Sequence, residues 1–148
     1  FIGTKSITNI FNNFWATYPT YRRWFDGIQR EALTKGYLRI PSGRVMRFPV
    51  ILDHKELRQA VNFPIQGTST DTNLLAMIEL APLLAQYNSW IILNVHDSLV
   101  IECDRRYRRQ VYELAKYIME KPRFPGFPSI PIEAKVGDNL GAVRKLAY

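Results

Sequence analysis

A histidine and an aspartate stand side by side between two apolar runs in the second half of the chain. The runs occupy residues 90–93 and 99–101, and His96 and Asp97 lie between them. Apolar runs separated by polar turn residues are typical of a β-hairpin. Because an aspartate is tolerated in a turn and costly inside a buried strand, we expect the hairpin to present the Asp97 carboxylate at its tip.

A carboxylate held on a rigid hairpin suits magnesium. Mg²⁺ takes oxygen ligands and is often bound through one or two carboxylates together with substrate phosphates. A His-Asp turn is also an ordinary polar turn in many proteins, and a motif this short does not by itself distinguish the two interpretations. A second motif must decide whether Asp97 takes part in chemistry.

The second motif lies upstream of the hairpin. Arg58, Asn62 and Gln66 follow one another at intervals of four, and the stretch GTSTD occupies residues 67–71. Residues four apart share a helix face, and donors on that face could reach the minor groove of DNA, where every base pair presents acceptors at similar positions. By themselves, however, such side chains are more typical of an ordinary polar helix surface. We expect Pro64 to kink or end the helix, so that a bend places Gln66.

Together the two motifs resemble the C-terminal part of the polymerase domain of family A DNA polymerases, which include bacterial DNA polymerase I and many phage replicases. In that family an Arg, an Asn and a Gln spaced four apart precede a GT(A/S)-x-D helix, and a hairpin bearing His-Asp follows. The resemblance extends over the whole chain, because YLRIPSGR is similar to the family's hairpin upstream of this helix and IPIEAKVG is similar to its last strand.

The resemblance implies nucleotidyl transfer, in which a primer 3′-hydroxyl attacks the α-phosphate of a deoxynucleoside triphosphate and pyrophosphate leaves. It implies two Mg²⁺ ions, in general roughly 3.5–4 Å apart, that Asp97 shares with a second carboxylate. His96 is implied to be catalytic and to lie beside the primer terminus. Arg58, Asn62 and Gln66 are implied to contact the primer–template DNA.

Two parts of the family pattern are absent from the 148 residues. One is the D-Y-S-x-I-E segment with the second metal-binding aspartate, and the other is the fingers helix whose Lys and Tyr hold the incoming triphosphate. We therefore expect a C-terminal fragment or split subunit that needs an N-terminal polymerase polypeptide as its partner. The start at Phe1 instead of Met fits a processed or cut product. The implied location is the cytoplasm of a bacterial cell or of a phage-infected host.

One residue departs from the family pattern. Family members commonly have Glu after His-Asp, whereas this chain has Ser98. Single-subunit RNA polymerases, distant relatives that share the palm, often have His-Asp-Ser and are the first alternative, although the NFPIQGT stretch favours the DNA enzymes. A DNA-binding module that has lost catalysis is the second alternative, and the intact Asp97 argues against it.

Composition agrees with these expectations. The chain has the length of about one domain, and its net charge of +7 and pI near 9.7 favour polyanionic partners. A single cysteine, Cys103, excludes an intrachain disulfide. No apolar stretch approaches the roughly 18 residues of a membrane span, so we expect no membrane partner.

The elements that position the motifs follow from the spacing of apolar residues and from the positions of proline and glycine. A first helix is interrupted at Tyr18-Pro19, and a second covers about residues 20–35 and ends at Gly36. Four of its residues are expected to face inward: Trp24, Phe25, Ile28 and Leu33. Residues 37–40 and 45–48 should form a hairpin around Pro-Ser-Gly, and a helix should follow over residues 53–62.

Further along, Thr68 and Asp71 have capping-box spacing and predict the start of a long helix, which Pro82 should bend near its middle. After the His-Asp hairpin, residues 105–120 form an amphipathic pattern, with Val111, Leu114, Ala115 and Ile118 on its apolar face. Residues 121–131 should be a surface loop, and residues 132–136 a final strand.

The predicted fold class is α+β: the C-terminal portion of a polymerase palm, with a small antiparallel sheet carrying the His-Asp hairpin and backed by helices, plus part of the fingers. Residues 1–36 resemble part of the fingers, and residues 37–148 form the palm portion. Near the N-terminus we expect an exposed apolar contact for the missing polypeptide, formed by residues such as Ile2, Ile7, Ile10 and Phe11.

Overall fold

The computed structural model describes residues 4–146 and, for side-chain burial, residues 7–146. The chain divides into two compact units, Phe1–Thr68 and Ser69–Tyr148. Helices and two-stranded antiparallel sheets occur in both units, so the predicted α+β class is confirmed. Within residues 4–146, none of the helices combines the length and the apolar character that crossing a bilayer requires.

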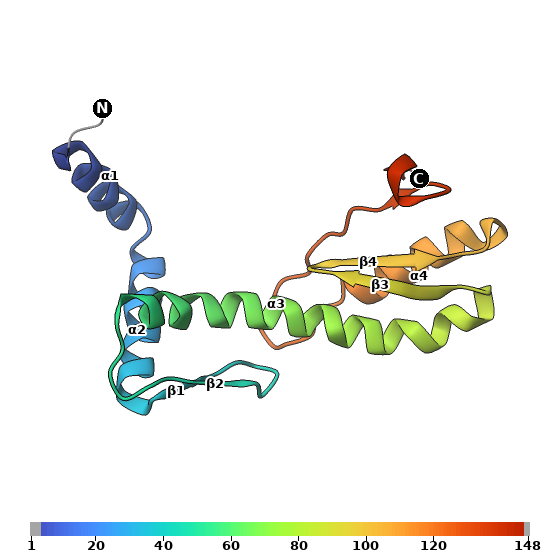
Figure 1. Ribbon diagram of the computed structural model, residues 1–148. Helices are drawn as coiled ribbons and strands as arrows, with labels where there is room; N and C mark the ends of the chain where they lie inside the picture. The colour runs from blue at the N-terminus through green and yellow to red at the C-terminus, as the bar shows by residue number, and fades with distance from the viewer. Residues whose placement is uncertain (1–3, 147–148) are drawn as a thin grey trace. The chain divides into compact units, whose positions relative to one another are not determined.

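The N-terminal unit contains two helices, a hairpin and the first part of a third helix (Figure 1): α1 (Thr4–Thr17), α2 (Pro19–Lys35), β1 (Tyr37–Arg39), β2 (Val45–Arg47) and the start of α3 (His54–Leu84). Pro19 suits the first turn of α2, because its missing amide has no partner there in any helix. Gly36 ends α2 with a left-handed φ of 71°, a conformation that glycine adopts without a steric cost. The predicted interruption at Tyr18-Pro19, the Gly36 stop and the β1–β2 hairpin are confirmed.

The core of this unit is small. Its buried residues come from α2, β1 and α3, and four half-buried side chains pack around them: Ala32, Leu38 and Ala60, surrounded by Ile28, Phe48, Leu52 and Phe63. The prediction that Leu33 faces inward is wrong, because it is 55% exposed while Ala32 is fully buried. Ala32 lies one turn beyond Ile28 on the inner face, and Leu33 lies about 100° further round the helix.

Helix α3 is continuous over 31 residues. Pro64 therefore does not end it, and the prediction that a new helix begins at Thr68 is wrong: Thr68 lies inside α3 and is 3% exposed. Pro64 removes only the amide that would donate to the carbonyl of Ala60, and packing on both sides keeps the helix together. Pro82, predicted near the middle of a helix, lies in its last turn.

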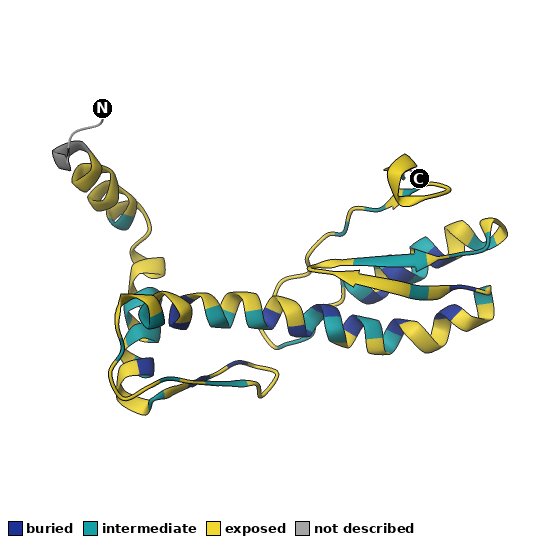
Figure 2. Cartoon of the chain, viewed as in Figure 1, coloured by how far each residue is buried: buried dark blue, intermediate teal, exposed yellow. Residues whose placement is uncertain are grey.

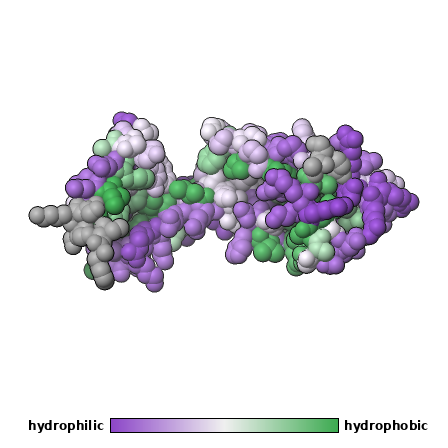
Figure 3. Space-filling model, turned by 90° about the horizontal axis from the view of Figure 1, so that it is seen from above, coloured by the Kyte–Doolittle hydropathy of each residue, from purple (hydrophilic) through white to green (hydrophobic). Residues whose placement is uncertain are grey.

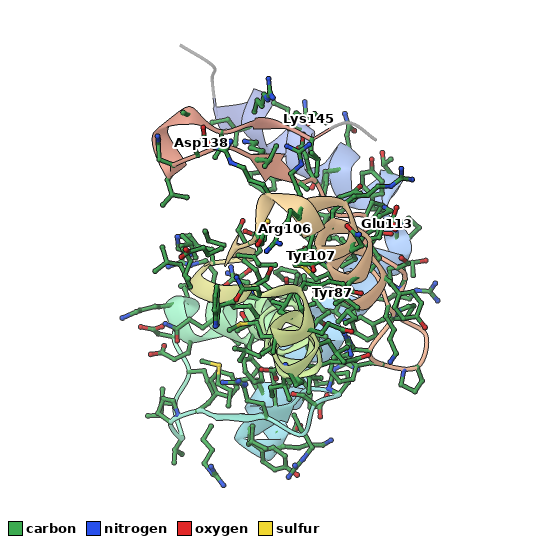
Figure 4. The ribbon with its side chains drawn as sticks, turned by 90° about the vertical axis from the view of Figure 1, so that its right-hand side faces the viewer. Tyr87, Arg106, Tyr107, Glu113, Asp138 and Lys145 are labelled. Atoms are coloured by element: carbon green, nitrogen blue, oxygen red, sulfur yellow. The ribbon has the colours of Figure 1, made fainter. Side chains whose placement is uncertain are left out.

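The C-terminal unit packs a hairpin and a helix against the second part of α3 (Figure 1): β3 (Trp90–Val95), β4 (Ser98–Glu102) and α4 (Arg108–Met119). Buried residues lie along α3 and α4, shown dark blue in Figure 2: Ala76, Leu80, Leu84, Val111, Ala115 and Ile118. The predicted amphipathic helix is confirmed, with a short 3₁₀ turn, η2 (Arg105–Tyr107), before it. Aromatic packing joins the ends of these elements, since the rings of Tyr87 and Tyr107 lie 5.7 Å apart and Arg106 lies over Tyr107 (Figure 4).

The last part of the chain is mostly irregular. The predicted loop over residues 121–131 is confirmed, and ion pairs from Lys121 and Arg123 to Glu79 tie it to α3. The predicted final strand is reduced to β5 (Lys135–Val136) and is not the last, because it pairs with β6 (Arg144–Lys145) beyond the 3₁₀ turn η3 (Leu140–Ala142).

Apolar side chains also reach the surface, where green residues adjoin purple ones in Figure 3. Of the apolar residues predicted to be exposed near the N-terminus, three lie on α1 with exposed fractions of 45% for Ile7, 59% for Ile10 and 59% for Phe11. Ile2 lies outside the described residues. The exposure of this face is confirmed, and its role as a partner contact stays a prediction.

Candidate functional site

The His-Asp pair forms the turn of the β3–β4 hairpin. Val95 pairs with Ser98, so only His96 and Asp97 lie in the loop, and both are exposed. His96 has a φ of 55°. The favoured turns of two-residue hairpins have a positive φ at the first loop position, since that conformation matches the twist of the strands. The predicted hairpin and the exposed position of Asp97 at its tip are confirmed.

One face of the hairpin rests on the core. Ile91, Leu99 and Ile101 pack against the buried residues of α3 and α4. The register shifts between Ile91 and Leu93, as at a β-bulge, and the outward side of β3 stays exposed, with 49% for Ile92 and 46% for Leu93. The turn is therefore supported from one side by an apolar base, as the sequence pattern predicts.

A buried amide on α3 contacts the hairpin, and sequence reasoning missed it. Asn73 is 8% exposed, and its Nδ2 lies 3.0 Å from Oδ1 of Asn94 and 3.5 Å from the backbone carbonyl oxygen of His96. The sequence signal is weak, because Asn73 ends a run of polar residues, Thr68–Asn73, that precedes the apolar Leu74 and Leu75. That signal does not reveal which group the side chain meets.

The site can supply one ligand to a metal ion. Asp97 presents an exposed carboxylate, and within residues 4–146 no three His, Cys, Asp or Glu side chains are grouped closely enough to enclose a cation. Mg²⁺ often binds through only one or two carboxylates and completes its shell with water and phosphate oxygens. An open carboxylate at a hairpin tip fits one share of such a site and does not form a complete one.

The other predicted site residues lie on α3 in the N-terminal unit. Arg58, Asn62 and Gln66 are all exposed, and the unbroken helix places them by its own periodicity. Helix α3 does not end at Pro64, so all three residues lie on one helix, and the bend expected there stays a prediction. His96 and Asp97 belong to the C-terminal unit, whereas Arg58, Asn62 and Gln66 belong to the N-terminal unit.

Close packing explains why the first residue of the GTSTD stretch, Gly67, is a glycine. A Cβ at Gly67 would lie 3.0 Å from Cδ1 of Ile40 and 3.4 Å from the ring of Phe63. The absence of a side chain lets Ile40, which is 3% exposed, pack closely against α3 beside the exposed Gln66. This glycine thus helps to hold the segment that carries the polar face.

Comparison with known proteins places these features in a family. The model of DNA polymerase family A matches residues 1–142. The chain is 33% identical over 131 residues to the thermostable DNA polymerase I of Thermus thermophilus, covering 84% of this chain and 15% of that protein. It is 36% identical over 113 residues to DNA polymerase I of Deinococcus radiodurans, covering 72% of this chain and 12% of that protein. The chain thus spans a small part of the length of these relatives.

A solved structure has a similar fold. It is described as the POL domain of Pol1 from M. smegmatis in complex with DNA primer-template and dNTP, and it superimposes with a TM-score of 0.73 at 24% identity. The match covers 80% of this chain and 22% of that chain. The family match extends over nearly all of the sequence, from the first helix past the His-Asp hairpin. The chain therefore belongs to DNA polymerase family A.

Proposed function

We propose that this chain takes part in template-directed DNA synthesis as the C-terminal portion of a polymerase domain. The observation that carries the proposal is the exposed Asp97 carboxylate at the tip of a two-residue hairpin whose strands rest on the core. Family membership supports it, because the match to DNA polymerase family A covers residues 1–142, which include both the polar face of α3 and the hairpin. The substrates would be primer–template DNA and deoxynucleoside triphosphates.

In this proposal each site residue has its own task. Asp97 binds Mg²⁺, and a bound pair of such ions would stabilise the attacking and leaving oxygens during nucleotidyl transfer. The imidazole of His96, next to Asp97 in the turn, contacts the primer end. Arg58, Asn62 and Gln66 donate to minor-groove acceptors that occur at similar positions in every correct base pair, so they hold the duplex without selecting a sequence.

The remaining parts of the site would come from a partner chain or an N-terminal half. A single carboxylate leaves most of the coordination of a cation to water, and two cations need carboxylates from separate segments. The missing polypeptide would supply the second aspartate and the helix that holds the triphosphate. Residues 1–36 would then belong to the fingers, and residues 37–148 to the palm.

The change Asp97→Asn tests the proposal, because it keeps the shape of the side chain and removes the charge that binds Mg²⁺. In the enzyme completed by its other part, we expect primer extension to fall more than about 100-fold while duplex binding stays within about twofold. Extension assays with Mg²⁺ and a binding titration measure the two effects. Asp138→Asn is the matched control, since Asp138 is an exposed aspartate paired with Arg105. Extension by Asp97→Asn within about tenfold of the unchanged enzyme, ~1.4 kcal/mol of barrier, would contradict the role of Asp97.

Ser98 is the residue that favours an alternative activity, RNA synthesis. It follows Asp97 where the family commonly has Glu, and it offers a hydroxyl instead of a second carboxylate. Parallel extension assays with ribonucleoside and deoxyribonucleoside triphosphates separate the two polymerase activities. We expect incorporation of deoxynucleotides, and a preference for ribonucleotides would replace the proposal by RNA synthesis.

A further inference from the structure

Three polar groups meet beneath the turn that carries Asp97. The side-chain amide of Asn73, on α3, lies 3.0 Å from Oδ1 of Asn94 on β3 and 3.5 Å from the backbone carbonyl oxygen of His96. Asn73 is 8% exposed, whereas Asn94 and His96 are exposed. A buried side chain of the helix thus reaches the tip of the hairpin.

The chemistry of the groups determines how the amides are oriented. A backbone carbonyl can only accept, so Asn73 must turn its NH₂ group, not its oxygen, towards His96. The two hydrogens of that group can serve two acceptors. Asn94 must therefore present its oxygen to Asn73, which is the arrangement observed. The longer of the two contacts, at 3.5 Å, lies at the limit of a hydrogen bond and is the weaker one.

Stability alone does not explain an asparagine at this position. Its Oδ1 is buried and has no hydrogen-bond partner among the described residues, and an unpaired buried acceptor disfavours folding. A leucine has the same branched shape and would place no polar atom in the packed side of α3, next to Ala76 and Leu80. The contacts that Asn73 makes to the hairpin are what distinguish it from an apolar residue.

The turn has a conformation that gains from such support. His96 is not glycine and has a φ of 55°, a left-handed conformation that costs a residue with a side chain some free energy. Its carbonyl and the amide of Asp97 belong to one planar peptide group. A contact that holds this carbonyl therefore also sets the plane from which the Asp97 side chain extends.

We infer that Asn73 is a positioning residue, which holds the peptide between His96 and Asp97 and so orients the Asp97 carboxylate. The structural part of this inference concerns the turn itself. Its catalytic part rests on the proposed function, because only a carboxylate that binds Mg²⁺ for nucleotidyl transfer links its direction to the reaction rate. Small errors of position are enough, since a displacement of about 1 Å can cost about 100-fold in rate.

The test replaces Asn73 in the completed enzyme and follows the turn and the reaction together. The chain has two histidines, so selective isotope labelling of histidine gives NMR signals from His96 at the turn and from His54 at the start of α3. For Asn73→Leu we expect shifted His96 signals and unchanged His54 signals. We expect kcat to fall about 10- to 100-fold while KM for the deoxynucleotide stays within about twofold.

Two further variants serve as controls. Thr68→Val removes another buried polar atom of α3 that has no hydrogen-bond partner, and it should change neither the His96 signals nor kcat. Asn73→Gln keeps a donor amide on a longer side chain, and it should recover part of kcat. If Asn73→Leu hinders folding, Asn94→Ala changes the same contact from an exposed position and should shift the His96 signals by a smaller amount.

The outcomes separate the two proposals. Unchanged His96 signals in Asn73→Leu, together with an inactive Asp97→Asn, would overturn the role of Asn73 and leave the proposed function standing. A fall in kcat that only follows a lower melting temperature, with His96 unmoved, would also overturn it. Shifted His96 signals with a fully active Asp97→Asn would support the role of Asn73 in the turn and contradict the metal-binding role of Asp97.

Discussion

Asp104 illustrates how a single residue connects the hairpin to the next helix. It follows β4, and its carboxylate accepts a hydrogen bond of 2.9 Å from the backbone amide of Arg106, which caps the 3₁₀ turn η2. The guanidinium of Arg106 lies 2.6 Å from the same carboxylate. This hydrogen-bonded ion pair with Arg106 lowers the pKa of Asp104 to about 2. The charged form of Asp104 is therefore favoured in the folded chain.

A pH dependence of stability follows from that pKa. The folded value of about 2 lies below the ordinary value of 3.8, so folding favours the ionised form. The contribution of Asp104 is fully present above its ordinary pKa and is lost as the pH falls from about 4 to about 2. We expect an NMR titration of the Asp104 carboxyl to give a midpoint near pH 2 in the folded chain.

Arg106→Gln provides the control for this prediction, because it removes the cation and leaves the backbone amide that Asp104 caps. Its Asp104 midpoint should rise towards 3.8, and stability should decrease less between pH 4 and pH 2. An unchanged midpoint in this variant would contradict the assignment of the shift to Arg106.

At the scale of elements, α3 presents different chemistry on its two sides. Ala60 and Val61 are buried, whereas Arg58, Asn62 and Gln66 are exposed along the helix. The helix continues through Pro64, so the three polar residues follow one regular spacing. Donors on a helix suit a duplex surface better than donors on a flexible loop, because the backbone of a helix loses little conformational freedom on binding.

Replacing two of these donors tests their contact with DNA. Arg58→Ala and Gln66→Ala should each weaken primer–template binding or extension by about 3- to 10-fold, the usual worth of one or two hydrogen bonds. They should also reduce discrimination against a mismatched primer end and create no sequence preference, since minor-groove acceptors are similar in all correct pairs. Matched and mismatched primers on several templates measure both effects.

Gln110→Ala is the matched control for the change at Gln66. Gln110 is also an exposed glutamine, and it lies on α4 instead of α3, so its loss should leave extension unchanged. A loss in Gln66→Ala that followed one particular base pair would point to direct sequence readout and contradict the proposed contact.

At the scale of the whole molecule, each of the two units carries one feature that the described residues leave exposed. In the C-terminal unit, Asp97 is a single exposed carboxylate at the tip of the β3–β4 hairpin. In the N-terminal unit, α1 exposes three apolar side chains, with exposed fractions of 45% for Ile7, 59% for Ile10 and 59% for Phe11. We interpret the exposed apolar face of α1 as a contact for further polypeptide, and this role stays a prediction. Both features agree with a chain that works together with further polypeptide.

We expect the 148 residues alone to have no polymerase activity and to gain it when a polypeptide with the second carboxylate and the triphosphate-binding helix is added. The two parts would be purified separately, mixed, and assayed for primer extension and for co-elution on a sizing column. A mixture made with Asp97→Asn is the control and should co-elute without extending primers.

Two results would contradict this prediction. Templated synthesis by the isolated chain would show that Asp97 does not need a carboxylate from elsewhere. A chain that binds DNA and stays inactive with every completing polypeptide would instead support a DNA-binding module without catalysis.

The sequence by itself determined the features that depend on neighbouring residues. The His-Asp turn, the stop at Gly36 and the amphipathic helix α4 were all predicted correctly, because apolar spacing and turn residues act over a few positions. The exposed position of Asp97 followed from the same local pattern. The family was also evident from motif order, before any three-dimensional information was used.

Tertiary structure decided the features that depend on packing between elements. It kept α3 intact through Pro64 and placed Thr68 inside the helix, because burial on both sides of the proline outweighs one missing hydrogen bond. It buried Ala32 and left Leu33 exposed, since only contact with β1 and α3 shows which face is inward. It also brought Asn73 to the carbonyl of His96, 23 positions along the chain, and no local pattern contains such a contact.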